Sequence, residues 1–384
     1  MKILHIVPYY IPAYRYGGPI RSVHGLCKAL AQLDHEVHVF TTNVDGPNNS
    51  DVPLSVPVDI DGVKVWYYPS QRLRRLYYSP DMKKALKQSI NSFDIVHLHS
   101  VFLWPTLVGA RICQKNQVPY LVAPRGMLVK DLIKRKSSWI KSLWIKLFEQ
   151  YTLEHASGIH VTSRLEEEEL KPFGFKLPSI FMIPNGIDIP DAISQKIAKN
   201  NDDTILFLGR VNWEKGLDRL IETMAYVPKG KLIIAGNDEE DYQKTLEQIA
   251  IKNGVSNRIQ FIGSVYNEEK EKLLSGASML VLPSYSENFG IVILEAMSYG
   301  CPVIVTPEVG LADVVAKSGA GLVCEGEPDI LGKNINRLLD NPVLGVEMGK
   351  MGPRVAQEQF RWAVIARQME GIYQRLGKLC DSIN

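Results

Sequence analysis

Short runs of apolar residues separated by polar turns recur along the whole chain. The runs are rich in β-branched and aliphatic side chains, which is typical of buried parallel strands. The runs that predict strands are residues 2–8, 35–42, 63–68, 94–99, 120–124, 158–162, 204–208, 231–235, 259–262, 277–283, 303–306 and 319–323. Helical periodicity follows several of these runs, for example over residues 20–33 and 291–297. Strands that alternate with helices predict an α/β fold with parallel sheets.

The pattern of strand, glycine turn and helix starts twice, which predicts two doubly wound domains. The first domain is expected at residues 1–188 and the second at residues 202–360, with a polar linker at about 189–201. A last helix is expected from residue 361 onward. A chain of 384 residues can form two domains that each bury a core of their own.

The composition is that of an ordinary globular protein, with 45% apolar and 22% charged residues. No apolar run approaches the roughly 20 residues that span a bilayer. The first residues read as a strand and not as a signal peptide. The cysteines are scattered and odd in number, so they indicate neither a zinc site nor a disulfide framework, and a reducing cytosol is expected. They are Cys27, Cys113, Cys301, Cys324 and Cys380.

The net charge of +2 conceals two halves of opposite sign. Residues 1–180 carry 23 basic and 15 acidic side chains, a balance of +8, and the remainder carries 21 and 27, a balance of −6. The basic half would suit a nucleic acid, an anionic membrane or a charged acceptor. No zinc finger or other nucleic-acid motif occurs in the sequence, so we expect no nucleic-acid partner.

Residues 284–296 have the strongest pattern of a ligand site. They follow an apolar run, pass through a polar turn at Gly290 and continue as a helix. The free amides at such a helix start favour an anion such as phosphate. Glu287 and Glu295 flank this start, and carboxylates accept hydrogen bonds well from sugar hydroxyls. A ligand with both phosphate and polyol parts would fit this pattern. The alternative is that Glu287 and Glu295 are two ordinary surface acids beside a helix.

Other residues of interest also lie where predicted strands end. Gly17 and Gly18 form a turn that lets the backbone approach a ligand, or an ordinary tight turn. His99 ends an apolar run near the expected mouth of the sheet. Arg210 and Lys215 surround the start of a helix, where fixed cations suit a diphosphate, and exposed loop charges are the alternative.

The run S-E-N-F-G-I-V-I-L-E-A-M, which contains Glu287 and Glu295, resembles the E-x7-E signature of retaining family 4 glycosyltransferases with the GT-B fold. The resemblance includes the H-x-H pattern ending at His99, the P-R-G-M loop at residues 124–127 and the I-P-N-G-I-D run at residues 183–188. It extends from the first strand to the last helix and is closest to members that build polysaccharides.

This resemblance implies two Rossmann-like domains facing a central cleft, with the helix at about 361–384 packing back on the first domain. It implies a hexosyltransferase that retains the anomeric configuration, needs no metal and no cofactor, and uses a nucleotide diphosphate sugar, UDP-sugar favoured over GDP-sugar. The acceptor would be a glycan or a lipid-linked molecule bound on the first domain.

The resemblance also implies roles for single residues. Arg210 and Lys215 would neutralise the donor diphosphate, Glu287 would hold the donor sugar, Glu295 the ribose, and His99 would help to orient the sugar. The remaining donor-side residues would be Gly17, Gly18, Ile262, Asn288, Phe289 and Gly290, and the acceptor-side residues Arg125 and Gly126.

Two other functions stay open on the sequence alone. A nucleotide-sugar epimerase of the same fold would change the donor without an acceptor, and a non-catalytic binder would leave it unchanged. The sequence lacks a G-x-G-x-x-G fingerprint after a strand, a P-loop and an Asp-x-Asp metal motif, which disfavours dinucleotide oxidoreductases and metal-dependent transferases.

A helix predicted over residues 130–151 pairs an apolar stripe with basic residues. The stripe is Ile140, Leu143, Trp144, Leu147 and Phe148, and the basic residues are Lys134, Arg135, Lys136, Lys141 and Lys146. Such a helix can lie in a membrane interface or pack into its own domain. We therefore expect a cytoplasmic protein that attaches peripherally to an anionic surface on the cytoplasmic face. The charge run Glu166–Glu169 is expected on a solvated helix face.

Overall fold

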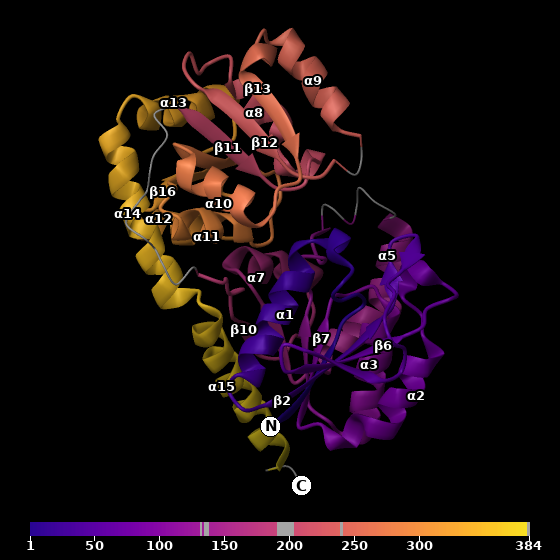
Figure 1. Ribbon diagram of the computed structural model, residues 1–384. Coiled ribbons are helices and arrows are strands. Elements are labelled where there is room, and N and C mark those ends of the chain that lie inside the picture. Colours follow the sequence, from indigo (N-terminus) through magenta and orange to yellow (C-terminus); the bar gives the residue numbers. More distant parts are fainter. Residues whose placement is uncertain (131–132, 134–137, 190–202, 239–240, 382–384) are drawn as a thin grey trace. The chain divides into compact units, whose positions relative to one another are not determined.

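The computed structural model describes residues 1–130, 133, 138–189, 203–238 and 241–381 (Figure 1). The chain forms two compact units. Unit 1 contains Met1–Gly186 and Trp362–Asn384, and unit 2 contains Ile187–Arg361.

Unit 1 is built on an eight-stranded sheet in the order β10-β9-β8-β7-β1-β2-β6-β5. All neighbouring strands are parallel except β5, which runs antiparallel to β6. The strands are β1 (Lys2–Ile6), β2 (Glu36–Thr42), β5 (Pro57–Ile60), β6 (Val63–Tyr68), β7 (Ile95–His99), β8 (Tyr120–Ala123), β9 (Gly158–Val161) and β10 (Ile180–Met182). A separate small hairpin joins β3 (Val44–Asp45) and β4 (Asn48–Asn49).

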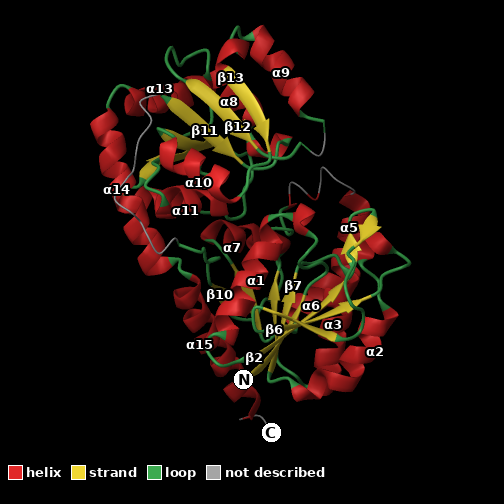
Figure 2. Ribbon diagram, in the orientation of Figure 1, coloured by secondary structure: helices red, strands yellow, loops and turns green. Residues whose placement is uncertain are grey.

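Helices cover both faces of this sheet (Figure 2). Alternate residues of β1 point to opposite faces, so Ile3 packs with α1 and α15, whereas Leu4 packs with α2 and α3. The helices are α1 (Gly18–Ala31), α2 (Pro80–Ser89), α3 (Trp104–Asn116), α5 (Ser138–Trp144), α6 (Gln150–Glu154), α7 (Arg164–Leu170) and α15 (Trp362–Asp381). Short 3-10 turns lie at η1 (Tyr14–Tyr16), η2 (Arg74–Leu76), η3 (Ile90–Ser92) and η5 (Lys171–Phe173).

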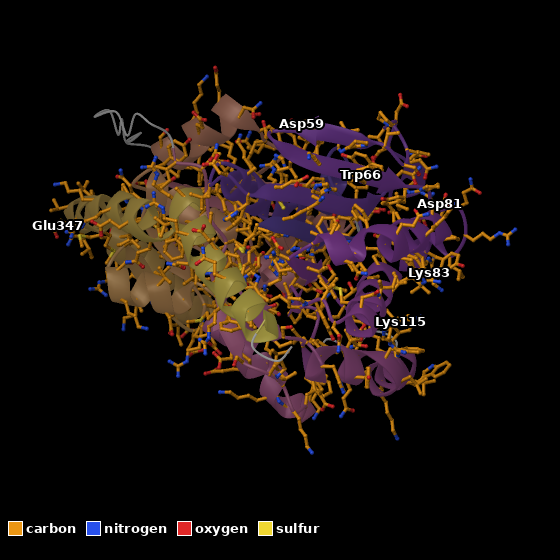
Figure 3. The ribbon with its side chains drawn as sticks, turned by 90° about the horizontal axis from the view of Figure 1, so that it is seen from below. Asp59, Trp66, Asp81, Lys83, Lys115 and Glu347 are labelled. Carbon is orange, nitrogen blue, oxygen red and sulfur yellow. The ribbon has the colours of Figure 1, made fainter. Side chains whose placement is uncertain are left out.

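The outer faces of these helices carry charged side chains. Asp81 and Lys83 on α2 and Lys115 on α3 point away from the sheet (Figure 3). Ser79 caps α2 because its side chain accepts a hydrogen bond from the Met82 amide over 3.3 Å. Polar outer faces and apolar inner faces give these helices the amphipathic character of a doubly wound domain.

Unit 2 is built on a six-stranded, wholly parallel sheet in the order β13-β12-β11-β14-β15-β16. The strands are β11 (Thr204–Leu208), β12 (Lys231–Ala235), β13 (Ile259–Gly263), β14 (Met279–Leu282), β15 (Val303–Val305) and β16 (Gly321–Val323). The helices are α8 (Leu217–Thr223), α9 (Gln243–Lys252), α10 (Asn267–Gly276), α11 (Ile291–Ser298), α12 (Ala312–Ser318), α13 (Pro328–Leu339) and α14 (Pro342–Gln359). The 3-10 turns are η6 (Trp213–Lys215) and η7 (Ser256–Arg258).

Each sheet has one position where the strand order changes direction. In unit 1 the chain starts at β1, builds outward to β2 and β6, and then returns to β7 on the other side of β1. In unit 2 it starts at β11, builds outward to β12 and β13, and returns to β14 beside β11. Ligands of doubly wound sheets bind outside the carboxyl ends of the strands at such switch points.

The basic helix predicted at residues 130–151 differs from the expectation in its side-chain arrangement. The described part is helical from residue 138 to residue 154, but a π-helical turn, Ile145–Glu149, interrupts it. Its exposed apolar side chains are Trp139, Leu143, Leu147 and Tyr151, whereas Trp144 and Phe148 of the predicted stripe are half-buried. Lys134, Arg135, Lys136 and the side chain of Ile140 lie outside what the structure describes.

The expectation of a solvated acidic run at residues 166–169 holds only for Glu168, which is exposed, since Glu167 and Glu169 are half-buried. Glu166 is buried, and its carboxylate accepts hydrogen bonds from the amides of Gly126 and Thr162, each over 2.7 Å. The Gly126 amide is 40 residues away in the sequence, so the local pattern does not reveal this partner. Among the described helices, none has the length and apolar content that crossing a bilayer requires.

Candidate functional site

The loops after β11 and β14 meet at the switch point of unit 2. The first loop carries Arg210 and Lys215, and the second carries Glu287. The loops are joined because the Tyr285 amide donates to the Glu214 carbonyl over 2.8 Å. Gly216 makes this approach feasible: its φ is 64°, and a Cβ there would overlap the carbonyl of Pro283.

Lys215 and Glu287 form an ion pair across the switch point, from Lys215 Nζ to Glu287 Oε2. Their side chains are only 12% and 19% exposed. The backbone of Glu287 is fixed as well, since its amide donates to the Glu308 carbonyl over 3.0 Å and its own carbonyl accepts from the Gly310 amide over 2.8 Å. The pair therefore presents a cation and a carboxylate on a rigid backbone at the carboxyl edge of the sheet.

Helix α11 begins at Ile291, four residues after Glu287. Gly290, with φ of 84°, caps it, and Asn288 and Phe289 form the turn before it. The first amides of an α-helix have no partner inside the helix, so this start is suited to an anion. Glu295 lies farther along α11 and pairs with Lys270 of α10, 2.6 Å from oxygen to nitrogen.

The remaining residues predicted in unit 2 lie around the same sheet edge. Arg210 follows β11 and has an exposed side chain. Ile262 is half-buried near the carboxyl end of β13, two strands away from β11. The sheet edge thus brings together cations, helix amides, carboxylates and an apolar side chain, the groups that a nucleotide diphosphate sugar would need.

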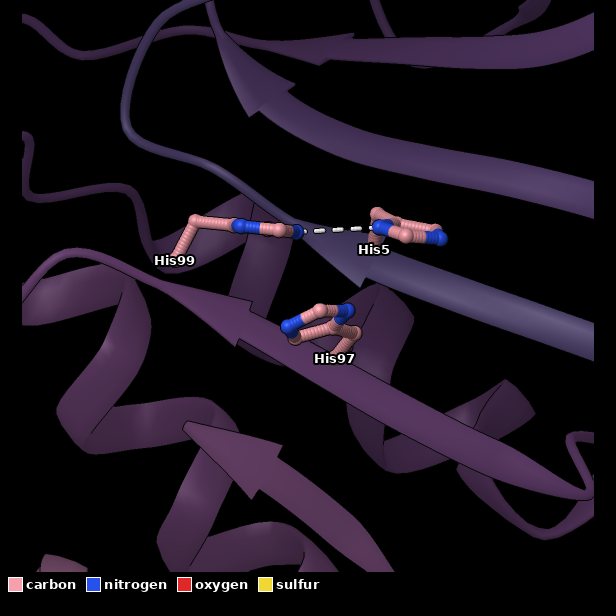
Figure 4. Close-up of side chains that lie close together, drawn as sticks. All are labelled: His5, His97 and His99. Atoms are coloured by element: carbon pink, nitrogen blue, oxygen red, sulfur yellow. Dashed lines mark hydrogen bonds between the residues drawn. The ribbon is translucent and has the colours of Figure 1, made fainter. Parts of the chain in front are cut away.

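His99 is the last residue of β7, beside β1 at the switch point of unit 1. It is 2% exposed, and its Nε2 atom lies 2.9 Å from Nδ1 of His5 (Figure 4). Burial, the neighbouring His97 and the guanidinium of Arg125 together hold the pKa of His99 well below its usual range. Burial and Arg125 lower the pKa of His5 to about 3.

One nitrogen atom from each of His5, His97 and His99 lies within 4.8 Å of the others, close enough to consider a metal site. Hydrogen bonds occupy both ring nitrogens of His97 and of His99. His99 Nδ1 lies 3.1 Å from the Arg125 guanidinium, and His97 Nδ1 lies 2.7 Å from the Tyr373 hydroxyl. A permanent cation beside the cluster opposes a second cation, so we interpret it as a hydrogen-bond network.

Arg125 and Gly126, the predicted acceptor-side residues, follow β8. Both have left-handed backbones, with φ of 58° and 69°. Arg125 Nη1 donates to Asn185 Oδ1 over 2.9 Å, and buried Glu166 holds the Gly126 amide. Non-glycine residues in this conformation are uncommon and persist where surrounding contacts hold them, often at functional sites.

Gly17 and Gly18 lie between β1 and the body of α1. Gly17 is the N-cap of α1 with φ of 72°, and Gly18 is the first residue of that helix. The turn therefore sits at the carboxyl end of β1, on the same sheet edge as His99. A Cβ at Gly17 or Gly18 would meet no atom within 4 Å. The positive φ at Gly17 is therefore what favours glycine at that position.

Sequence reasoning missed Glu149, a buried acid in the π-helical turn. It is 1% exposed, and its Oε1 atom accepts from the Phe102 amide and from the Trp144 indole. Burial raises its pKa. Glu149 supports the loop that follows His99, in which Ser100 and Phe102 both have left-handed backbones. The only indication of this buried acid in the sequence was its position among apolar and basic residues.

Two family models together match nearly the whole chain. The model for glycosyltransferase family 4 matches residues 16–190, and the model for glycosyl transferases group 1 matches residues 189–355. The chain belongs to the family 4 glycosyltransferases. Members of this family are retaining enzymes that use nucleotide sugars, and the two parallel sheets described above are those of the GT-B fold.

Relatives of this glycosyltransferase match over 97% of the chain. An uncharacterized glycosyltransferase of Methanocaldococcus jannaschii is 28% identical over 97% of this chain and 98% of its own. The glycogen synthase of Mycobacterium tuberculosis is 27% identical over 97% of this chain and 94% of its own. These relatives place the enzyme in the family without indicating its acceptor.

Solved structures support the fold of this glycosyltransferase. Sucrose-phosphate synthase from Thermosynechococcus elongatus superposes with a TM-score of 0.76 at 24% identity, covering 99% of this chain and 100% of the other. The Anabaena protein HepE, solved in complex with UDP-glucose, superposes with a TM-score of 0.74 at 20% identity, covering 98% and 100%. At these identities the likeness is one of fold.

Proposed function

We propose that this enzyme transfers a hexose from a nucleotide diphosphate sugar, with UDP-sugars favoured over GDP-sugars, to a glycan or lipid-linked acceptor in polysaccharide biosynthesis. The observation that carries the donor half is the Lys215–Glu287 pair beside the start of α11. Few ligands need a cation, helix amides and a carboxylate at one place, and a diphosphate attached to a sugar is one of them.

In this proposal the cations of unit 2 act on the diphosphate. Arg210 and Lys215 neutralise it, and the amides of Asn288, Phe289 and Gly290 add hydrogen bonds. The negative charge on the diphosphate grows as the glycosidic bond breaks, so fixed positive groups stabilise the transition state more than the ground state. These groups stabilise the diphosphate charge without a metal ion, and no cofactor is needed.

The other parts of the donor are bound by the two carboxylates, Glu287 and Glu295, and by the side chain of Ile262. Glu287 accepts hydrogen bonds from the sugar hydroxyls, with Lys215 holding its carboxylate in place. Glu295 accepts from the ribose hydroxyls, and Ile262 packs against the base. Residues 202–360 thus form the donor domain.

Residues 1–188 with the last helix, about 361–384, form the acceptor domain. Gly17 and Gly18 bring backbone toward the donor phosphates and the acceptor, and His99 helps to orient the donor sugar. Arg125 and Gly126 lie on the acceptor side. The excess of basic residues in the first half of the chain supports an anionic acceptor or surroundings.

The proposed chemical step retains the configuration at the anomeric carbon and is taken by analogy with the family. The acceptor hydroxyl attacks the anomeric carbon from the face that the diphosphate leaves, and a phosphate oxygen of the departing nucleotide takes the proton. The bond from the anomeric carbon to the phosphate oxygen breaks as the new glycosidic bond forms. No protein carboxylate has to act as nucleophile in this step.

Calorimetry with UDP-glucose, GDP-mannose and ADP-glucose tests the donor preference. UDP-glucose is the first choice because the structural neighbour HepE was solved with it. We expect saturable binding of a UDP-sugar without added metal, and transfer to a saccharide acceptor with the donor's anomeric configuration retained in the product. Binding of GDP-mannose alone would overturn the base preference. Conversion of the donor in the absence of any acceptor would favour an epimerase.

We further propose that the enzyme works peripherally on an anionic bilayer at the cytoplasmic face. The support is the row of exposed side chains on the helical segment 138–154: Trp139, Leu143, Leu147 and Tyr151 are 73%, 51%, 53% and 46% exposed. Exposed Lys146 lies on the same segment. Indole and phenol rings suit the headgroup region and leucines the acyl boundary, while lysine heads attract anionic lipid.

Cosedimentation with vesicles tests this attachment. We expect binding to phosphatidylglycerol vesicles that weakens as salt rises, and little binding to phosphatidylcholine. Replacing Leu143 and Leu147 with Gln should abolish it while leaving UDP-sugar binding intact. Val343→Gln, which changes an exposed apolar residue of unit 2, is the matched control. Wild-type protein that ignores anionic vesicles at low salt would refute the attachment.

A further inference from the structure

Four buried histidines of unit 1 form two hydrogen-bonded pairs. His5 on β1 pairs with His99 on β7 over 2.9 Å, and His97 on β7 pairs with His160 on β9 over 3.2 Å. A neutral imidazole has one N–H and one lone pair, so a single pair could be arranged in either direction. The outer hydrogen-bond partners of each pair determine which histidine donates and which accepts.

The second pair ends at a backbone carbonyl. His160 Nε2 lies 2.9 Å from the Ile183 carbonyl oxygen, which can only accept, so Nε2 of His160 carries the proton. Its Nδ1 is therefore the lone pair, and His97 Nε2–H donates to it. His97 Nδ1 is then left to accept from the Tyr373 hydroxyl, which lies 2.7 Å away.

The first pair ends at a guanidinium. Arg125 approaches His99 Nδ1 with Nε at 3.3 Å and Nη2 at 3.1 Å. A guanidinium only donates, so Nδ1 of His99 is the lone pair and its Nε2–H donates to His5 Nδ1. His5 then carries its proton on Nε2, a buried atom without a hydrogen-bond partner among the described residues.

The environment keeps these rings neutral. The titratable groups that face His99 are His97 on its own strand, His5 on β1, His160 on β9 and Arg125 after β8. Burial and these neighbours disfavour the imidazolium form. The Tyr373 hydroxyl on α15 faces His97, and Glu166 on α7 is the carboxylate that acts on Arg125.

We infer that Arg125 and His5 are positioning residues that lock His99 in its Nε2–H tautomer. The lone pair and the N–H of His99 are both occupied inside the protein, so His99 is not a proton acceptor in the reaction. Its proposed part in orienting the donor sugar then depends on where its ring is held and not on a hydrogen bond from a ring nitrogen. Arg125 is thereby reassigned from contact with the acceptor to support of His99. The tautomer follows from the hydrogen bonds alone, whereas its effect on turnover rests on the proposed function.

Imidazole nitrogen NMR of the full chain with 15N-labelled histidine tests the tautomer directly. We expect His5, His97, His99 and His160 to give four Nε2–H patterns that do not titrate between about pH 6 and 8. An Nδ1–H pattern or a titrating signal for His99 would overturn the inference, whether or not the enzyme transfers sugar.

Variants then test the positioning role. Arg125→Met should give His99 a mixture of tautomers and lower turnover about tenfold or more, with the donor KM nearly unchanged. Arg125→Lys should recover part of the loss. Arg164→Met, which changes an exposed arginine of α7, is the control and should change neither the NMR pattern nor the turnover.

His5→Gln and His5→Phe provide a second route should Arg125→Met fold poorly. The Gln oxygen can still accept from His99 Nε2–H, so His5→Gln should retain the His99 pattern, whereas His5→Phe should lose it together with turnover. An unchanged His99 pattern in both Arg125→Met and His5→Phe would overturn the inference. A fall in turnover in Arg125→Met with an unchanged pattern would mean that Arg125 contacts substrate instead.

Discussion

The buried carboxylate of Glu149 holds the backbone of Phe102: its Oε1 atom accepts a hydrogen bond from the Phe102 amide over 2.6 Å. The same oxygen accepts from the Trp144 indole over 2.8 Å. Phe102 has φ of 62°, and it lies three residues after His99. Thr106 adds hydrogen bonds to the carbonyls of His99 and Ser100. The loop after His99 is therefore fixed from two sides.

Replacing Glu149 with Ala should loosen this loop. The Phe102 amide would lose its acceptor inside the protein, and an unsatisfied buried donor costs about 1–3 kcal/mol. We expect the free energy of unfolding in urea to fall by about that amount, turnover to fall, and UDP-sugar affinity in calorimetry to stay the same. Glu149→Gln keeps an acceptor oxygen and should lose less. Normal turnover and stability in the Ala variant would show that the contact does not matter.

The Lys215–Glu287 pair predicts that the two residues affect different parts of the donor. Lys215→Met should weaken binding of bare UDP about tenfold to a hundredfold, the equivalent of a lost charge-assisted hydrogen bond of roughly 1.5–3 kcal/mol. Glu287→Gln should leave UDP binding nearly unchanged and reduce turnover, because its carboxylate acts on the sugar. The measurement is UDP calorimetry beside steady-state kinetics, with exposed Lys244→Met as control. Equal losses of UDP binding in both variants would contradict these roles.

Activity should survive removal of divalent metal ions. In the proposed function Arg210, Lys215 and the start of α11 stabilise the diphosphate charge, so transfer should not depend on a metal ion. We expect transfer in EDTA to match transfer in untreated buffer. Loss of activity in EDTA that Mg²⁺ or Mn²⁺ restores would overturn this part of the proposal.

Glu169 predicts a pH-dependent contribution to stability. Burial, and secondarily the nearby Glu166, raises the pKa of Glu169 to about 7 from its ordinary value near 4.5. The folded state therefore binds more protons than the unfolded state between these values, and stability falls as pH rises through that window. Glu169→Gln should raise the unfolding free energy at pH 8 by roughly 1–2 kcal/mol and change it little at pH 4.5. Urea titrations at both pH values measure this, and an equal effect at both would refute it.

Much of the fold was predictable because parallel strands buried on both faces are continuous apolar runs. The predicted runs 63–68, 204–208 and 231–235 coincide with β6, β11 and β12. The start of α11 was predictable too, because Gly290 and the following apolar residues mark a helix boundary locally. These features are determined by residues close together in the sequence, so they can be predicted from local patterns.

The buried carboxylates were not predictable for the opposite reason. Glu166 binds the Gly126 amide, 40 residues away, and Glu149 binds the Phe102 amide, 47 residues away. The sequence does not show whether a carboxylate is hydrated or accepts a hydrogen bond from a distant amide. Glu149 is the last residue of the π-helical turn, and the exposed apolar side chains of this segment differ from the predicted stripe.

Unit 1 is assembled from two separate stretches of chain, whereas unit 2 is one continuous stretch. Trp362, the first residue of the returning stretch, lies against Gly25 and Gly186, and a Cβ at either glycine would overlap its ring. Farther along, Tyr373 completes the histidine network through His97. If unit 2 binds the donor as proposed, exchanging residues 187–361 between related chains changes the donor, whereas residues 1–186 and the final helix have to come from the same chain because they form one unit.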